Sequence, residues 1–281
     1  MKYIINSILS KAYWRYIFSL EGLKSIFAIF GIIWLIIETL DFFKVYTRDE
    51  YASYAFFIFM ILAIIFSILL RRPIKSISIT FPEYDVSIEV RIDNMFEING
   101  ATMISTNTDF EADVAGGKIS VDSLQGQFTA KYFTGNQNVL IKDINDKLEI
   151  INPNGPYPMG TTITINTHGK TFYFTAMSTL GEGGNASSSI SDIKTALDGL
   201  WDYVRDSGEL QELIVPVIGT GRGRIQISRK KMIALISESF IKASMENKFA
   251  NKLIIAVRPE DSKKFAINLY EVKDHLVHVL K

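Results

Sequence analysis

A run of twenty uncharged, mostly apolar residues constrains this chain more than any other feature of its sequence. The run extends from Tyr51 to Leu70 (YASYAFFIFMILAIIFSILL) and is closed by Arg71, Arg72 and Pro73. As an α-helix it would be roughly 30 Å long, which matches the hydrocarbon thickness of a bilayer. A helix on the surface of a soluble protein carries polar residues along one face, whereas the polar residues of this run are limited to Ser and Tyr. We therefore expect a membrane-spanning helix over 51–70.

A second apolar stretch precedes the first one in the chain. It is centred on Ile26–Leu40 (IFAIFGIIWLIIETL) and reaches a spanning length over about 23–43. Glu38 and Asp41 lie at its far end, where a carboxylate can reach the interface at a lower cost than at the bilayer centre. The alternative is a cleaved signal or a peripheral segment, but a long segment precedes the stretch and no small-residue cleavage site follows it. A two-helix membrane hairpin is the favoured interpretation.

The basic residues around these stretches predict how the hairpin is oriented. The connection between the two stretches carries only Lys44 and Arg48. The outer flanks carry more: Lys2, Lys11, Arg15, Lys24, Arg71, Arg72 and Lys75. Because Lys and Arg are enriched in cytoplasmic flanks, both termini are expected in the cytoplasm. Residues 1–22 mix aromatic and basic side chains, which is typical of an interfacial amphipathic helix or of a packing helix between protomers.

Composition excludes several classes of function. The 30 basic and 30 acidic residues balance, so no net attraction to nucleic acid follows from charge. The absence of Cys excludes disulfides, thiolate nucleophiles and Cys-ligated zinc. The three His do not form a metalloprotease-type pair. A metal-dependent enzyme is therefore not expected, and no metal site is predicted.

The remainder of the chain, 73–281, reads as one α/β domain. Strands are predicted over Val86–Ile92, 101–106, 162–167, 170–176, 213–218 and 253–257. Helices are predicted over 122–133, 138–150, 191–205 and 228–244, followed by one C-terminal helix. Alternation of strands and helices in the second half implies a mixed, largely parallel sheet with helices on both faces.

Three loops collect eight of the 18 glycines. They are 107–118 (NTDFEADVAGGK), 181–185 (GEGGN) and 219–224 (GTGRGR), and each follows a predicted strand. Ligands bind at the carboxyl ends of strands in open α/β sheets, and glycine lets backbone N–H groups approach an anion. The GxGxxG and GxxxxGK[ST] patterns are both absent, so neither a dinucleotide dehydrogenase nor a P-loop protein is indicated. The loops predict a nucleotide-type pocket, although each alone could be an ordinary turn.

Three segments carry a resemblance to a known family. They are ATMISTNTDF at 101–110 with the pair Gly116-Gly117, SLQGQF at 123–128, and VPVIGTGRGRI at 215–225. Together they resemble the macro domain, an ADP-ribose-binding α/β module, and in particular that of the transmembrane Thoeris effectors of bacterial anti-phage defence. Two spans followed by this module is the architecture of that family, so the resemblance covers nearly the whole chain. It implies a transmembrane hairpin (23–72) followed by a macro-type domain (73–281).

The resemblance also implies a function. A partner TIR-domain protein that consumes NAD would make an ADP-ribose-derived messenger, and similar effectors bind histidine-ADP-ribose. Binding would drive homo-oligomerisation and disruption of the inner membrane lipid bilayer, leading to abortive infection. The resemblance thus implies a receptor rather than an enzyme, with no catalytic residues and no cofactor. The alternatives are a membrane-tethered ADP-ribosyl hydrolase, which would use Asn107 or Asp109, and a passive reader of ADP-ribosylated proteins.

By position, the resemblance places Asn107 and Asp109 near the distal ribose and 219–223 around the pyrophosphate, with 181–185 closing over the ligand. The adenine amino group would meet Asp93 or Asn94, because the chain has Asp-Asn-Met where the family pattern has Gly-Asp-Ile. Asn107 could instead cap the following turn, and Arg222 and Arg224 could pair with phosphate, pair with a histidine carboxylate, or lie at the surface. The expected ligand-binding residues are Asp93, Asn94, Asn107, Asp109, Phe110, Gly116, Gly117, Ser123, Gln125, Gly181, Gly183, Asn185, Gly219, Thr220, Gly221, Arg222, Gly223 and Arg224.

Overall fold

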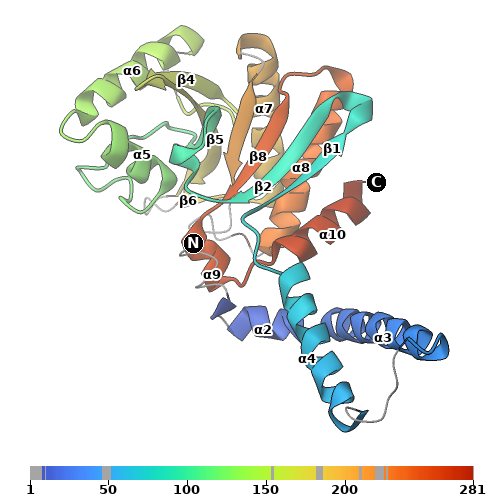
Figure 1. Ribbon diagram of the computed structural model, residues 1–281. Helices are drawn as coiled ribbons and strands as arrows, with labels where there is room; N and C mark the ends of the chain where they lie inside the picture. Colours follow the sequence, from blue (N-terminus) through green and yellow to red (C-terminus); the bar gives the residue numbers. More distant parts are fainter. Residues whose placement is uncertain are drawn as a thin grey trace. The chain divides into compact units, whose positions relative to one another are not determined.

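The computed structural model divides the chain into two compact units, Met1–Ile74 and Lys75–Lys281, which are described separately below (Figure 1). The structure describes residues 8–9, 11–45, 52–152, 155–181, 186–208, 211–218, 225 and 227–280. The division falls two residues after the domain boundary expected from the sequence.

The first unit consists of helices. They are α2 (Lys11–Ile17), α3 (Leu20–Phe42) and α4 (Ala52–Leu70). Helix α3 begins three residues before the span predicted from residue 23, because the Ser19 hydroxyl accepts a hydrogen bond from Gly22 N–H and caps it. In the described part of the chain, α3 alone is long and apolar enough to cross a membrane, with a hydropathy of 2.0, and the shorter apolar helix is Tyr54–Leu70.

Helix α2 packs against the end of its own hairpin. The Tyr13 hydroxyl donates to the Ile68 carbonyl at 3.4 Å. The Arg71 guanidinium donates to the Glu21 carbonyl at 2.9 Å and lies 4.9 Å from the centre of the Tyr16 ring. One side of α2 is therefore used for packing within the unit, and the interfacial position of residues 1–22 stays a prediction.

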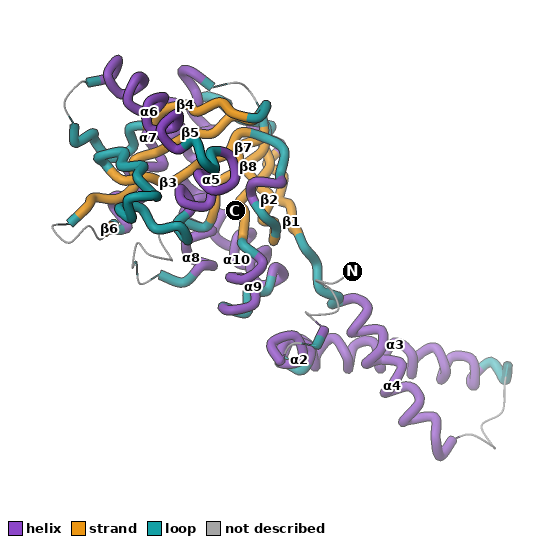
Figure 2. Tube along the Cα trace, turned by 90° about the vertical axis from the view of Figure 1, so that its left-hand side faces the viewer, coloured by secondary structure: helices purple, strands orange, loops and turns teal. Residues whose placement is uncertain are grey.

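The second unit is an α/β fold (Figures 1 and 2). Its strands are β1 (Ser76–Phe81), β2 (Val86–Ile92), β3 (Ala101–Asn107), β4 (Thr162–Thr167), β5 (Lys170–Leu180), β6 (Ala186–Ser187), β7 (Glu212–Pro216) and β8 (Lys252–Val257). Its α-helices are α5 (Leu124–Tyr132), α6 (Gln137–Ile151), α7 (Ile190–Ser207), α8 (Arg229–Glu246), α9 (Pro259–Lys264) and α10 (Leu269–Leu280). Two short 3₁₀ helices, η1 (Pro82–Tyr84) and η2 (Met95–Glu97), follow β1 and β2.

The sheet is mixed and largely parallel, as expected. Its strand order is β1-β2-β8-β7-β3-β5-β4, with β6 paired to β5 outside this path. The five central strands β2, β8, β7, β3 and β5 are parallel, and β1 and β4 pair antiparallel at the two edges. The carboxyl ends of the five parallel strands therefore meet along one edge of the sheet.

Alternation along the strands divides the core between two helical layers, as predicted. On β5, Phe172 and Phe174 contact the Phe128 ring of α5, with ring centroids 4.7 and 5.0 Å apart. Tyr173, between them, points to the other face and meets Tyr203 of α7 at 6.0 Å. The period of two residues along a strand thus places α5 and α7 on opposite faces.

Several elements differ from the sequence prediction. Strand β1, which alternates Ser-Ile-Ser-Ile, was not predicted, and β5 continues four residues past Ala176. The single predicted C-terminal helix is two helices, because Ala266 adopts a positive φ of 48° between α9 and α10. A backbone in that region cannot continue a right-handed helix.

Candidate functional site

The edge formed by the carboxyl ends of the parallel strands collects polar loops from distant parts of the sequence. Asp93 follows β2, Arg258 follows β8, and Asp109 lies two residues after β3. Backbone hydrogen bonds align the ends of these strands with that of β8. Asp93 N–H, after β2, donates to the Val257 carbonyl at 3.0 Å, and Val217 N–H, after β7, donates to the Ala256 carbonyl at 3.2 Å. This edge is where an open α/β sheet binds ligands, so it is the candidate site.

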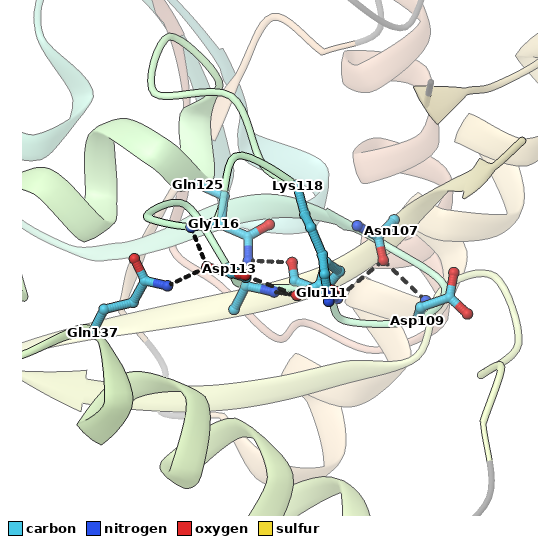
Figure 3. Close-up of polar contacts among 9 residues, drawn as sticks. Asn107, Asp109, Glu111, Asp113, Gly116, Lys118, Gln125 and Gln137 are labelled. Atoms are coloured by element: carbon cyan, nitrogen blue, oxygen red, sulfur yellow. Dashed lines mark hydrogen bonds and ion pairs between the residues drawn. The ribbon is translucent and has the colours of Figure 1, made fainter. Parts of the chain in front are cut away.

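Asn107 closes the turn that leaves β3. Its side-chain oxygen accepts hydrogen bonds from Asp109 N–H at 3.0 Å and Glu111 N–H at 3.1 Å (Figure 3). The side chain is almost fully buried, and the register of β3 against β5 shifts at this residue. The capping alternative is therefore correct for the oxygen. A contact with a ligand would have to use the Nδ2 amide.

Glu111, which is not among the expected ligand-binding residues, anchors the middle of the loop. One carboxylate oxygen accepts from Ala112 N–H and Asp113 N–H, both at 3.0 Å, and the other pairs with Lys118 at 2.8 Å. Partial burial acts to raise the pKa of Glu111, but the bonds from Lys118 and the two backbone N–H groups outweigh it and lower that pKa. The sequence feature that could have indicated the Glu111–Lys118 ion pair is the presence of both residues in one glycine-containing loop.

Gln125 ties this loop to α5. Its amide donates to the Glu111 carbonyl at 2.9 Å, and its oxygen accepts from the Thr106 hydroxyl at 3.1 Å. Ser123 caps α5, since its hydroxyl accepts from Gly126 N–H at 2.9 Å. Phe110 is buried and its ring meets Tyr157 edge-on at 5.5 Å. All three predicted contact residues thus hold the loop in place, and any ligand contact by Phe110 would have to come from its backbone.

The glycine pair forms a turn around Asp113. Gly116 N–H donates to the Asp113 carboxylate at 2.6 Å, and Gly117 N–H donates to the Val114 carbonyl at 3.1 Å. A Cβ on Gly116 would lie 2.1 Å from an Asp113 oxygen, so a larger residue there would displace the carboxylate. Gln137 of α6 donates to the same carboxylate at 3.2 Å (Figure 3). Both glycine N–H groups, expected to approach the ligand, already donate within the loop.

The bond from Gly116 is the main cause that lowers the pKa of Asp113, with a further contribution from Gln137. Glu111 and Asp113 are therefore both held in the ionised form by their neighbours. A carboxylate whose pKa is lowered by hydrogen bonds is a weak general base.

Asp93 and Asn94 have different surroundings. The Asn94 side-chain oxygen accepts from Phe96 N–H at 3.2 Å and caps η2. One Asp93 carboxylate oxygen accepts from Asn94 N–H at 2.9 Å. Because Asn94 is used as a cap, Asp93 is the better placed of the two to accept a hydrogen bond from a ligand at this edge.

The other two glycine loops are mostly outside the described residues. Gly181 is exposed directly after β5. The positions not described are Gly183, Asn185, Gly219, Thr220, Gly221, Arg222, Gly223 and Arg224. Among the residues that the structure does describe, no three His, Asp or Glu side chains are grouped so that they could hold a metal ion.

Comparisons with known proteins agree with this geometry. Residues 88–258 match the family model of the macro domain of the Thoeris protein ThsA. A substituted macrodomain of Oceanobacillus iheyensis is similar in fold, with a TM-score of 0.52 at 12% identity over 73% of this chain and 99% of that one. The O. iheyensis macrodomain with ADP gives a TM-score of 0.51 at 12% identity over 72% of this chain and 98% of that one. No functionally curated protein matches the sequence.

Proposed function

Because the chain belongs to the Thoeris ThsA macro-domain family, we propose that its second unit is a receptor for an ADP-ribose derivative. One observation carries the proposal. The family match over 88–258 includes nearly all of β2 and the whole of β3, β5, β7 and β8, whose carboxyl ends form the candidate site. The similarity in fold to a macrodomain that binds ADP supports a nucleotide diphosphate as part of the ligand.

We propose binding without turnover. The Glu111 and Asp113 carboxylates beside Asn107 are ionised, and their pKa values are lowered by backbone and side-chain donors. General-base catalysis is most efficient when the pKa lies near the operating pH. These two groups therefore support a rigid receptor loop and are poor candidates for a general base. A hydrolase using Asn107 or Asp109, and a passive reader of ADP-ribosylated proteins, are the alternatives.

The output is proposed to be in the membrane. Helices α3 and α4 would form the two-span hairpin, with both termini and the ligand unit on the cytoplasmic side of the bacterial inner membrane. The proposed messenger is histidine-ADP-ribose, made from NAD by a TIR-domain partner, and its binding would promote homo-oligomers that disrupt the lipid bilayer. A ligand can do this only if it binds the assembled state more tightly than the separate protomers.

The full-length chain in detergent micelles tests the receptor assignment. Calorimetric titration with ADP-ribose and with histidine-ADP-ribose should show binding of both, with tighter binding of the histidine adduct. The ligand recovered after long incubation should be unchanged. Conversion of either compound would select the hydrolase, and the absence of binding would refute the receptor.

Liposomes containing the same chain test the output. Release of a trapped dye should depend on histidine-ADP-ribose and should be accompanied by larger oligomers after crosslinking. Ligand binding without release or association would favour the passive reader.

A further inference from the structure

Strand β1 leaves one edge of the sheet open. It is the terminal strand, and in the part of the chain that the structure describes it pairs with β2 alone (Figures 1 and 2). Ile92 N–H donates to the Lys75 carbonyl at 2.8 Å. Because hydrogen-bonded and non-hydrogen-bonded pairs alternate along an antiparallel ladder, the odd-numbered residues of β1 bond to β2. The backbone N–H and C=O groups of Ser76, Ser78 and Thr80 therefore point away from the sheet, and we call these three residues the outer edge of β1.

The outer edge of β1 lacks the usual protection against pairing. Native proteins block edge strands with charged residues, with Pro or with a bulge. Ser76–Phe81 contains no charged residue and no Pro, and its register with β2 is continuous. All three outer-edge residues are exposed. The edge thus offers an extended strand an accessible row of donors and acceptors.

The opposite edge of the sheet, formed by β4, is less accessible. By the same alternation, its register with β5 turns residues 162, 164 and 166 outward. Thr162 is buried, and the Thr164 hydroxyl is hydrogen-bonded to the Tyr203 hydroxyl of α7 at 2.9 Å. Of the two terminal strands, β1 is therefore the better candidate for pairing with another chain.

The outer edge of β1 is complementary to itself. If two copies of β1 pair antiparallel, Ser78 can lie opposite Ser78 of the second copy, and Ser76 then lies opposite Thr80. Every outward-facing residue meets another one in this register, so about six backbone hydrogen bonds can form. Hydroxyl groups meet on the exposed face and can hydrogen-bond across the strands. Ile77 meets Ile79 on the other face, and no like charges are brought together.

We infer that two copies of this chain associate through antiparallel pairing of their β1 strands, which joins the two sheets into one. The inference rests on the proposed function, because it names the contact surface of the proposed homo-oligomers. A strand of six residues is about 20 Å long, and its pairing alone buries less area than a stable interface needs. Strand β1 begins shortly after α4 ends at Leu70, so copies that share a bilayer hold their β1 strands at a high effective concentration. A weak contact is then sufficient.

Cysteine cross-linking of the full chain in liposomes tests the register, because the chain contains no Cys. Ser78→Cys should give a disulfide-linked dimer on oxidation, since the Cα atoms of the two copies of residue 78 would lie about 5.5 Å apart. Ser76→Cys is the matched control, because its two copies would lie about 14 Å apart and should not cross-link. Ser76→Cys combined with Thr80→Cys should restore the cross-link. Each chain is oxidised with and without histidine-ADP-ribose, and a dimer with this pattern in either condition supports the pairing.

Substitutions that block the outer edge test its part in assembly. Ser78→Pro removes an N–H that points outward and leaves the ladder with β2 intact, which is the position in which an edge strand tolerates Pro. Ser78→Lys places two positive charges opposite each other. Both variants should keep the Tm and the ADP-ribose affinity of the unsubstituted chain and should lose the dimers trapped by an amine-reactive cross-linker. Ser78→Thr, which keeps the hydroxyl and the N–H, should retain them.

Equal cross-linking of Ser76→Cys and Ser78→Cys, or no cross-linking of either, would overturn the inference. Normal association and dye release in Ser78→Pro and Ser78→Lys would also overturn it and would leave the proposed receptor intact. If the unsubstituted chain binds no ADP-ribose derivative but Ser78→Cys cross-links without one, the proposed function fails and the pairing of β1 is supported.

Discussion

Substitution of Asn107 separates the structural role of this residue from its proposed contact with the ligand. Its side-chain oxygen accepts two backbone hydrogen bonds, at 3.0 and 3.1 Å. Asn107→Ala removes this one oxygen, so the N–H groups of Asp109 and Glu111 both lose their acceptor. At a net value of about 1 kcal/mol for each hydrogen bond, the loss is about 2 kcal/mol of unfolding free energy. For a unit of this size, that corresponds to a decrease of about 4–8 °C in Tm.

Asn107→Asp keeps the acceptor oxygen and replaces the amide by a second oxygen. Backbone N–H groups bind a carboxylate at least as well as an amide oxygen, so Tm should change by no more than about 2 °C. Ligand binding should respond differently. Loss of the amide donor, together with a new negative charge beside an anionic ligand, should weaken ADP-ribose binding by tenfold or more, which is about 1.4 kcal/mol or more.

Thermal unfolding and calorimetric titration of the two variants in detergent micelles measure the two effects separately. Asn99→Asp is the matched control, because it makes the same chemical change at an exposed residue before β3, at the opposite end of that strand. Normal ADP-ribose affinity in Asn107→Asp would refute a contact through the amide. An unchanged Tm in Asn107→Ala would refute the energetic role of the turn.

Three further predictions concern other contacts. The folded-state pKa of Glu111 lies below its ordinary value of 4.5, so its ionised form stabilises the fold above pH 4.5 and loses this effect as the pH falls through the folded-state pKa. Glu111→Gln should therefore flatten the dependence of Tm on pH below 4.5. An unchanged slope would contradict this role of Glu111. Gly116→Ala should displace the Asp113 carboxylate and lower Tm by several degrees, since an added Cβ lies 2.1 Å from it; a normal Tm would contradict this close packing. Gly22→Leu should detach α2, because a Cβ at residue 22 would lie 1.9 Å from the Ile17 carbonyl oxygen. Detachment should increase the rate of proteolysis near α2, and an unchanged rate would contradict the packing of α2.

The loop after β3 illustrates how the structure changes the meaning of a motif. The Gly116-Gly117 pair indicated backbone N–H groups open to an anion, but both N–H groups donate within the loop. Gly116 lies close to the Asp113 carboxylate, and Gly117 adopts a positive φ of 80°, which favours glycine. A glycine pattern is compatible with both uses, and only the position of the surrounding acceptors distinguishes them.

The sequence alone determined the features that depend on local periodicity. The apolar run at 51–70, the alternation in Val86–Ile92 and the helical spacing over 191–205 predicted α4, β2 and α7, because hydrophobic patterns repeat within a few residues. The order of strands and helices predicted the largely parallel sheet, and the motifs at 101–110 and 215–225 indicated the family.

Only the tertiary structure decided which side chains meet at the edge of the sheet. Glu111 takes its donors from Lys118 and from its own turn, and Gln137 reaches the Asp113 carboxylate from α6. Arg258 becomes a neighbour of Asp93 only because β8 inserts between β2 and β7. The pairings of Gln137 with Asp113 and of Arg258 with Asp93 join residues far apart in the chain. They depend on strand order and register, which hydrophobic periodicity does not encode.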